Sequence, residues 1–242
     1  MTDRIAMWSG PRNLSTAMMR SFGSRADTFI SDEPFYGCFL KSTGAPHPMC
    51  DEVTSDMDCD WRSVMATLSG PVPGGSPIWY QKHMWHHMTG PIGYEDFAGF
   101  THAFLIREPE RMIASYLRKR EAAEFRDFGM ERQAEFFERE ADRLGRAPAV
   151  VDANDVLASP EAVLSKLCEA IGIAWGPAML SWPPGRRDTD GPWAPHWYAA
   201  VEASTEFEPP EADEVELPDD AQRVADQCRP YYERLAKYRI RP

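Results

Sequence analysis

Short apolar runs alternate along this chain with segments whose apolar residues recur at helical spacing. The apolar runs predict buried strands, and they lie at residues 5–8, 29–33, 78–82 and 102–106. A helix is predicted after the last of these runs, with one apolar face made by Met112, Ile113, Tyr116 and Leu117. Strands that alternate with helices are typical of a doubly wound α/β fold, with a mainly parallel sheet and helices on both faces.

Three segments between these elements are rich in proline, glycine or charge, which predicts linkers at 44–60, 70–77 and 207–220. The last is acidic and proline-rich, so we expect a solvated connector near 206–220 and an amphipathic C-terminal helix over 221–238. A chain of 242 residues can bury an ample core as one unit. We therefore expect a single domain over 1–242.

Charge and cysteine content narrow the class of protein. The formal net charge of −12 argues against nucleic acid as a partner. No apolar run reaches the ~18 residues of a membrane span, and the charged start Thr2-Asp3-Arg4 does not resemble a signal peptide. We therefore expect no membrane partner. The 5 cysteines are scattered without a C-x-x-C pair, which favours free thiols in the cytoplasm over a disulfide frame or a zinc site.

The run at 5–8 leads directly into a turn and a helix that can hold an anion. The residues of this candidate cradle are Gly10, Pro11, Arg12, Asn13, Ser15 and Thr16. A strand–loop–helix of this kind points backbone N–H groups and the positive end of the helix at one anion. Arg12 adds a bidentate donor for phosphate or sulfate oxygens. The alternative is that this segment has a purely structural role, as a strand followed by a capped helix. The nucleoside-triphosphatase pattern is absent, because no Gly-Lys precedes the hydroxyl residues.

A second candidate anion site follows the run at 102–106. Arg107 lies at the carboxyl end of that predicted strand, where open α/β sheets bind ligands. Pro109 suits the first position of the next helix, and Glu110 complements the positive end of that helix. Ser115 comes about two turns into the helix and can face the same crevice. The basic run at 118–120 is interpreted as a solvated helix face, which is favoured over ligand contact.

Together these two segments resemble the PAPS-dependent sulfotransferases, and the chain looks closest to the bacterial sulfotransferase-like P-loop proteins. The family's donor is 3′-phosphoadenosine 5′-phosphosulfate (PAPS). In the family a loop of the form P-[KR]-x-G-[ST]-T holds the phosphosulfate, and an R-x-P-x-x-x-x-x-S segment holds the 3′-phosphate. Residues 11–16 match the first motif, and Arg107, Pro109 and Ser115 match the second at the family's spacing.

Two later segments agree with the resemblance. Residues 149–161 resemble the family's strand, acidic turn and helix, and residues 182–193 resemble its basic loop over the nucleotide, with Arg186 and Arg187 as the nucleotide contacts. The resemblance covers roughly residues 4–200 in the family's order, which is more specific than any single motif. One departure is Leu14, where the family has glycine. We therefore expect that the loop does not freely adopt a positive φ at this position.

The sequence offers two places for the group that accepts the proton of the sulfated hydroxyl. Glu33 follows the second predicted strand, and one branch of the family has a glutamate base in a K-E-P-H-F-type segment. The apolar residues at 34–36 would partly desolvate Glu33, which raises the pKa of a carboxylate and improves a base. The alternative for Glu33 is a helix or turn cap.

The other place is the histidine-rich turn after Lys82. The cytosolic branch of the family has K-x-H here, with the histidine as base, whereas this chain has Met84 at that position. His86 and His87 are close enough in sequence to face the same crevice, either as acceptor-pocket residues or as structural histidines. No Asp/Glu-His spacing completes a metal site with them, and no metal is expected.

These observations predict in-line transfer of a sulfuryl group from PAPS to a hydroxyl, or an amine, of a small molecule. Arg12 and the loop amides would neutralise developing charge, and Lys82 with Glu33 or a histidine would complete the catalytic set. Two other functions stay open. The first is a non-catalytic protein that binds an adenosine nucleotide. The second is a small-molecule kinase, which the lack of Gly-Lys-Ser/Thr and of an evident magnesium carboxylate disfavours.

Overall fold

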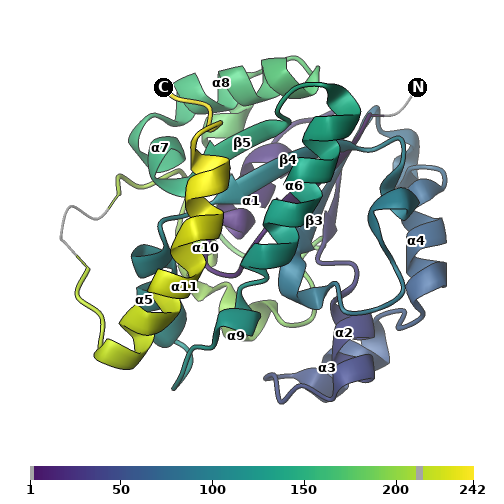
Figure 1. The fold of residues 1–242 in the computed structure, drawn as a ribbon. Coiled ribbons are helices and arrows are strands. Elements are labelled where there is room, and N and C mark those ends of the chain that lie inside the picture. Colours follow the sequence, from purple (N-terminus) through teal and green to yellow (C-terminus); the bar gives the residue numbers. More distant parts are fainter. Residues whose placement is uncertain (1–2, 211–214) are drawn as a thin grey trace.

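Residues 3–210 and 215–242 are described by a computed structural model, in which helices surround one sheet (Figure 1). The strands are β1 (Asp3–Ser9), β2 (Thr28–Asp32), β3 (Ile78–Met84), β4 (Thr101–Ile106) and β5 (Ala149–Asp152). The α-helices are α1 (Ser15–Gly23), α2 (Tyr36–Thr43), α3 (Cys50–Asp56), α4 (Trp61–Ser69), α5 (Pro109–Leu117), α6 (Met130–Leu144), α7 (Ala153–Ala158), α8 (Pro160–Ile171), α9 (Ala194–Trp197), α10 (Ala199–Ala203) and α11 (Asp219–Ala236). Short 3₁₀ helices lie at Pro73–Gly75, Trp85–His87, Tyr94–Phe97, Phe125–Asp127 and Pro177–Leu180.

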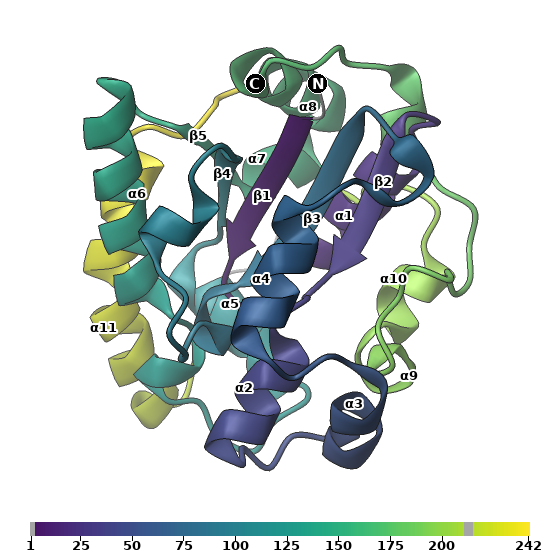
Figure 2. The ribbon, with the colours of Figure 1, turned by 90° about the vertical axis from the view of Figure 1, so that its right-hand side faces the viewer.

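The sheet is parallel throughout, with the strand order β2-β3-β1-β4-β5. The central strand β1 pairs with β3 and β4, so that Ser9 lies opposite Met84 on one side and Leu105 on the other. Figure 2 shows the strands running together towards α2, α5 and α9. This arrangement confirms the predicted doubly wound α/β fold. It also brings the loops after β1, β2, β3 and β4 to one edge of the sheet, where such folds bind ligands.

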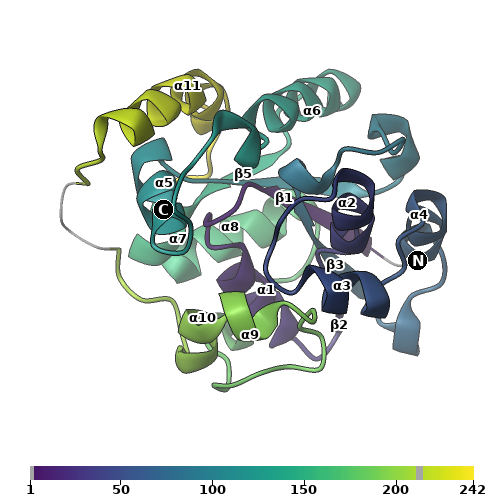
Figure 3. The ribbon, with the colours of Figure 1, turned by 90° about the horizontal axis from the view of Figure 1, so that it is seen from below.

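Alternating side chains of β1 divide the core between the two faces of the sheet. Ile5 and Met7 pack in a cluster with residues of α1 and α8, whereas Ala6 and Trp8 pack in a second cluster with residues of α4 and α6. Figure 3 shows α6 and α11 on one side of the sheet and α1 and α8 on the other. Because both faces are covered, the strands are apolar almost continuously, which is why they could be recognised in the sequence.

The predicted linker at 44–60 is wrong over Cys50–Asp56, which forms α3. Val53 anchors this helix in the core, and Asp51 and Glu52 complement the positive end of the helix dipole. In the predicted connector, residues 207–210 and 215–218 form neither helix nor strand, and 211–214 lie outside the described residues. The C-terminal helix begins and ends slightly earlier than predicted. None of the helices that the structure describes is long and apolar enough to cross a membrane.

The start of α4 offers a test of the fold that is independent of function. Asp60 caps this helix, because its Oδ1 accepts hydrogen bonds from the backbone N–H groups of Arg62 at 2.9 Å and Ser63 at 2.8 Å. An N-cap of this kind contributes about 1 kcal/mol. We therefore expect Asp60→Ala to lower the melting temperature by about 2–4 °C in thermal denaturation followed by circular dichroism. Asp60→Asn keeps a cap and should stay near wild type, so an equal loss in both variants would contradict the capping role.

Candidate active site

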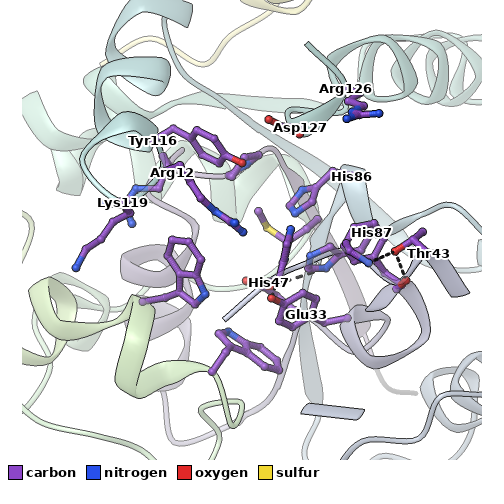
Figure 4. Close-up of a pocket in the computed structure, with 18 of the residues that line it drawn as sticks. Arg12, Glu33, Thr43, His47, His86, His87, Tyr116, Lys119, Arg126 and Asp127 are labelled. Carbon is purple, nitrogen blue, oxygen red and sulfur yellow. Dashed lines mark hydrogen bonds and ion pairs between the residues drawn. The ribbon is translucent and has the colours of Figure 1, made fainter. Parts of the chain in front are cut away.

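A cavity of about 990 Å³ opens at the carboxyl edge of the sheet. Figure 4 shows Arg12 and Lys119 on one side of it and His86 and His87 on the other. The residues predicted from sequence that line this cavity are Pro11, Arg12, Ser15, Thr16, Glu33, Lys82, His86 and His87. The fold thus brings together the loop after β1 (residues 10–14), which we call the anion loop after its predicted role, the carboxylate after β2 and the histidine turn after β3.

The loop after β1 contains two residues in the left-handed region, Arg12 at φ 62° and Leu14 at φ 71°. The expectation that Leu14 would keep the loop from a positive φ is therefore wrong. The left-handed conformation costs a residue with a side chain about 1–2 kcal/mol, and the packing of Leu14 against the core offsets that cost. Such turns aim successive backbone N–H groups at one point, and the positive end of α1 adds to the attraction for an anion.

Arg12 supplies the cation of this loop. Its Nε donates to Oγ of Ser115 at 3.1 Å, and Nη1 of Arg107 donates to the backbone carbonyl of Arg12 at 2.9 Å. Burial and the neighbouring Arg118 lower the pKa of Arg12, and no described carboxylate forms an ion pair with it. Asn13 is 1% exposed, and its Oδ1 has no partner among the described atoms. A partly buried cation without a carboxylate partner is suited to an anionic ligand.

Several predicted donor residues lie outside the cavity wall. Gly10 packs beneath the loop, where an added Cβ would come within 2.9 Å of the carbonyl oxygen of Phe128. Arg107 and Ser115 contact Arg12 instead of lining the cavity. Arg186 and Arg187 are not among the lining residues, and the Arg187 side chain donates to the carbonyl of Pro183. The contacts of these four cationic and hydroxyl residues with a nucleotide stay a prediction.

The interpretation of 118–120 as a solvated helix face is confirmed for the exposure of Arg118 and Lys119, but the segment is not helical. Helix α5 ends at Leu117, and Lys119 and Arg120 line the cavity. The loop that follows the helix also lines the cavity, through Glu121, Ala122 and Glu124. The Arg120 guanidinium lies 5.3 Å from the centre of the Trp197 ring, which also lines the cavity. This segment therefore adds positive charge to the mouth of the candidate site.

A buried lysine connects the ends of β2 and β3. Lys82 is 1% exposed, and its Nζ lies 2.9 Å from Oδ1 of Asp32, 2.6 Å from Oε1 of Glu33 and 2.6 Å from the hydroxyl of Tyr198. The three N–H bonds of the ammonium thus have three acceptors. Burial by itself would lower the pKa of Lys82, but the two carboxylates raise it well above its ordinary value. Lys82 is therefore a fixed cation and not a proton donor.

Sequence reasoning missed two members of this group, Asp32 and Tyr198. Asp32 could have been noticed as a second acid at the end of the same predicted strand. Tyr198 carried no signal, because its contact with Lys82 joins residues 116 positions apart.

Glu33 has the features of a proton acceptor. Its side chain is 11% exposed and lines the cavity, with Oε1 on Lys82 and Oε2 3.7 Å from Nδ1 of His87. Burial raises the pKa of Glu33; Lys82 opposes that change, Asp32 adds to it, and the pKa lies above its ordinary value. Glu33 is not the N-cap of α2, which is Phe35, and its part in the turn before that helix is a backbone hydrogen bond that its carbonyl accepts from Tyr36 N–H.

The histidines after Lys82 divide between core and cavity. His83 stacks on Trp8 with ring centres 4.5 Å apart and is not among the residues that line the cavity. Burial lowers the pKa of His86 to about 3 and that of His87 well below its ordinary value, with neighbouring histidines and cations adding to the effect. Both rings are therefore neutral near pH 7. A further histidine of the cavity, His47, was not foreseen. No described residues form a cluster of three or more His, Cys, Asp or Glu that could hold a metal ion.

Comparison with known proteins agrees with this geometry. A sequence profile of the sulfotransferase domain matches residues 3–239. The chain belongs to the sulfotransferase family. Two curated relatives from Arabidopsis thaliana are named branched-chain-amino-acid aminotransferase-like proteins 2 and 1. They are 34% identical over 228 residues and 36% over 207, which covers 94% and 85% of this chain. The chain spans only 40% and 37% of the length of these relatives.

Solved sulfotransferase structures share the fold. The sulfotransferase domain from the curacin biosynthetic pathway aligns with a TM-score of 0.57 and 17% identity, covering 100% of this chain and 99% of that one. A sulfotransferase from Alicyclobacillus acidocaldarius aligns with a TM-score of 0.55 and 15% identity, covering 100% of this chain and 97% of that one. Identities this low concern the fold alone, so the chemistry of this chain must be argued from its own residues.

Proposed function

We propose that this sulfotransferase transfers a sulfuryl group from PAPS to a hydroxyl, or an amine, of a small molecule. The observation that carries the proposal is that Arg12 and Glu33 line the same cavity, one as an unbalanced cation and the other as a carboxylate with a raised pKa. The cavity volume of about 990 Å³ lies at the upper end of the range for ligand pockets and leaves room for two substrates.

The residues present fit the donor. Arg12, the backbone N–H groups of the loop and the hydroxyls of Ser15 and Thr16 would hold the phosphosulfate. Arg107 and Ser115 would hold the 3′-phosphate, as in the family's second motif. Ser115 accepts a hydrogen bond from Arg12, so its own O–H proton stays available for donation.

Each group of the cavity then has a defined task. When bound, PAPS supplies an activated sulfuryl group. Arg12 and the loop amides stabilise the negative charge that develops on the oxygen of the leaving phosphate. Oε2 of Glu33 accepts the proton of the attacking hydroxyl, while Lys82 holds Oε1. The neutral His86 and His87 line the space beside this carboxylate.

Binding of adenosine 3′,5′-bisphosphate tests the donor assignment. We expect this ligand to raise the melting temperature more than AMP or ATP does, because only it offers a 3′-phosphate to Arg107 and Ser115. At a hundredfold excess over the dissociation constant a ligand adds about 2.7 kcal/mol of stability. Equal shifts with AMP and the bisphosphate would remove the basis for a 3′-phosphate site, and a larger shift with ATP and Mg²⁺ would favour a kinase.

Transfer itself is tested by incubating the protein with ³⁵S-labelled PAPS and a panel of phenols, alcohols and amines. A labelled product establishes the sulfotransferase reaction and its acceptor class. Tight binding of the bisphosphate without a product from any acceptor would favour the non-catalytic, nucleotide-binding function.

A further inference from the structure

Asp32 and Glu33 are neighbours in the sequence, yet both carboxylates contact the same ammonium group of Lys82. Successive side chains of an extended strand point to opposite faces, so a regular strand could not place them together. The backbone turns at Glu33, whose φ of 42° lies in the left-handed region. The Glu33 N–H donates to the carbonyl of Lys82 at 3.0 Å, and the Glu33 carbonyl accepts from the N–H of Tyr36 at 2.9 Å. Such a conformation is unfavourable for glutamate and persists only where its surroundings impose it.

The hydroxyl of Tyr198 lies at the centre of these surroundings. It accepts hydrogen bonds from Nζ of Lys82 at 2.6 Å and from Nε1 of Trp193 at 3.0 Å. It also donates to the carboxylate of Asp32, at 2.8 Å from Oδ2. Its donor and both acceptor positions are thus in use. Asp32 Oδ2 further accepts from the N–H of Gly191 at 3.2 Å.

We propose that Asp32 and Tyr198 are positioning residues that hold Lys82 against Glu33 and thereby orient Glu33 to accept the proton of the acceptor. This inference rests on the proposed function, in which Glu33 is the base, and it explains how Glu33 is oriented. Because the Tyr198 hydroxyl and the Gly191 N–H donate to Asp32, they balance part of its charge. Lys82 is left closer to Glu33, at 2.6 Å, than to Asp32, at 2.9 Å.

The 190–198 segment contacts both the sheet, through Gly191 and Tyr198, and the helix that follows the anion loop. Asp190 accepts two hydrogen bonds of 2.6 Å from Arg20 of α1, with side chains 0% and 3% exposed. Helix α1 begins directly after the loop that holds Arg12. One segment therefore fixes the helix behind the anion loop and, through Tyr198, the lysine that orients Glu33.

The charged and titratable groups around Glu33 predict the direction of the effect. They are Lys82 from β3, Asp32 from β2, His87 from the 3₁₀ helix Trp85–His87, Tyr36 from α2 and Tyr198 from the segment between α9 and α10. Without the Tyr198 hydroxyl, Asp32 loses a donor and competes more strongly for Lys82. The carboxylate of Glu33 then loses stabilisation, and the pKa of Glu33 rises further.

The experiment compares Tyr198→Phe with wild type by two measurements. The first is kcat as a function of pH, measured with an acceptor that the protein sulfates. We expect the acid limb of this pH profile to move up by about one pH unit, the size expected for one hydrogen bond to a charged group. The second is a ¹³C NMR titration of the Glu33 carboxyl carbon, identified by its loss in Glu33→Gln, which should shift in the same direction. The dissociation constant for adenosine 3′,5′-bisphosphate should not change.

Two further variants separate positioning from general instability. Tyr232→Phe is the matched control, because it also removes a tyrosine hydrogen bond to a buried aspartate, at 2.8 Å from Oδ2 of Asp152, and should leave the Glu33 titration unchanged. Asp32→Asn keeps an oxygen for Lys82 but removes the negative charge that raises the pKa of Glu33, so that pKa should fall, opposite to Tyr198→Phe. An unchanged Glu33 titration in both Tyr198→Phe and Asp32→Asn, or the same shift in Tyr232→Phe, would overturn the inference. The NMR titration decides this even if no acceptor is sulfated, in which case the proposed function fails separately.

Discussion

Replacement of Arg12 by alanine is expected to weaken the binding of adenosine 3′,5′-bisphosphate about 30- to 5,000-fold. Removing one partner of a buried, hydrogen-bonded charge pair costs about 2–5 kcal/mol of binding free energy. Arg12 forms no ion pair with a described carboxylate, so its charge is available to the ligand. The phosphate that Arg12 would contact is left with uncharged donors, the backbone N–H groups of the loop and the hydroxyls of Ser15 and Thr16. Isothermal titration calorimetry at constant ionic strength measures this change directly.

Two variants serve as controls for Arg12→Ala. Arg12→Lys keeps the charge but loses the planar fork, so we expect an intermediate loss of affinity. Arg234→Ala removes an equal charge from a half-exposed arginine on α11 and should bind like wild type. Arg234 forms a 3.6 Å ion pair with Glu138 and lies 5.2 Å from the centre of the Tyr231 ring. If Arg12→Ala melts like wild type and binds the bisphosphate with unchanged affinity, the loop after β1 does not hold the donor.

The loop after β1 could be located from sequence because its signals are local. An apolar strand, a Gly-Pro turn with a cation and paired hydroxyls follow one another within residues 5–16, and a parallel sheet then fixes where the loop lies. The positive φ of Leu14 could not be predicted in the same way. It depends on apolar contacts with a core that is assembled from distant segments. Local propensity favoured glycine there, and tertiary packing overrode it.

The acceptor side was harder to predict because its properties depend on burial and on long-range contacts. The sequence offered Glu33 and the histidine turn after Lys82 as separate candidates, and Glu33, Lys82, His86 and His87 line one cavity. It did not indicate that both histidines would be neutral, since their low pKa values come mainly from burial. Helix α3 was missed for a related reason: Val53 is its one fully buried residue, so the segment shows almost no apolar periodicity.

Replacement of Glu33 by glutamine is expected to lower turnover about 10²- to 10⁴-fold, the usual effect of losing a general base. Glutamine keeps an oxygen for Nζ of Lys82 and nearly the same shape, but it does not accept a proton at neutral pH. The affinity for adenosine 3′,5′-bisphosphate should therefore stay near that of wild type. Steady-state kinetics with the identified acceptor, together with calorimetry of the bisphosphate, measure both quantities.

The pH dependence of kcat tests the same role of Glu33 as the base. A base works in its deprotonated form, and the pKa of Glu33 is raised above its ordinary value by burial. The wild-type kcat should therefore rise as the pH increases through that raised pKa and then level off, whereas Glu33→Gln should lack this rise. His86→Asn and His87→Asn test the competing assignment, in which a histidine is the base. Both rings line the cavity, but their lowered pKa values make them weak bases. If both histidine variants lose turnover by this amount and Glu33→Gln retains it, the proton acceptor lies on the turn after β3 and Glu33 serves only to hold Lys82.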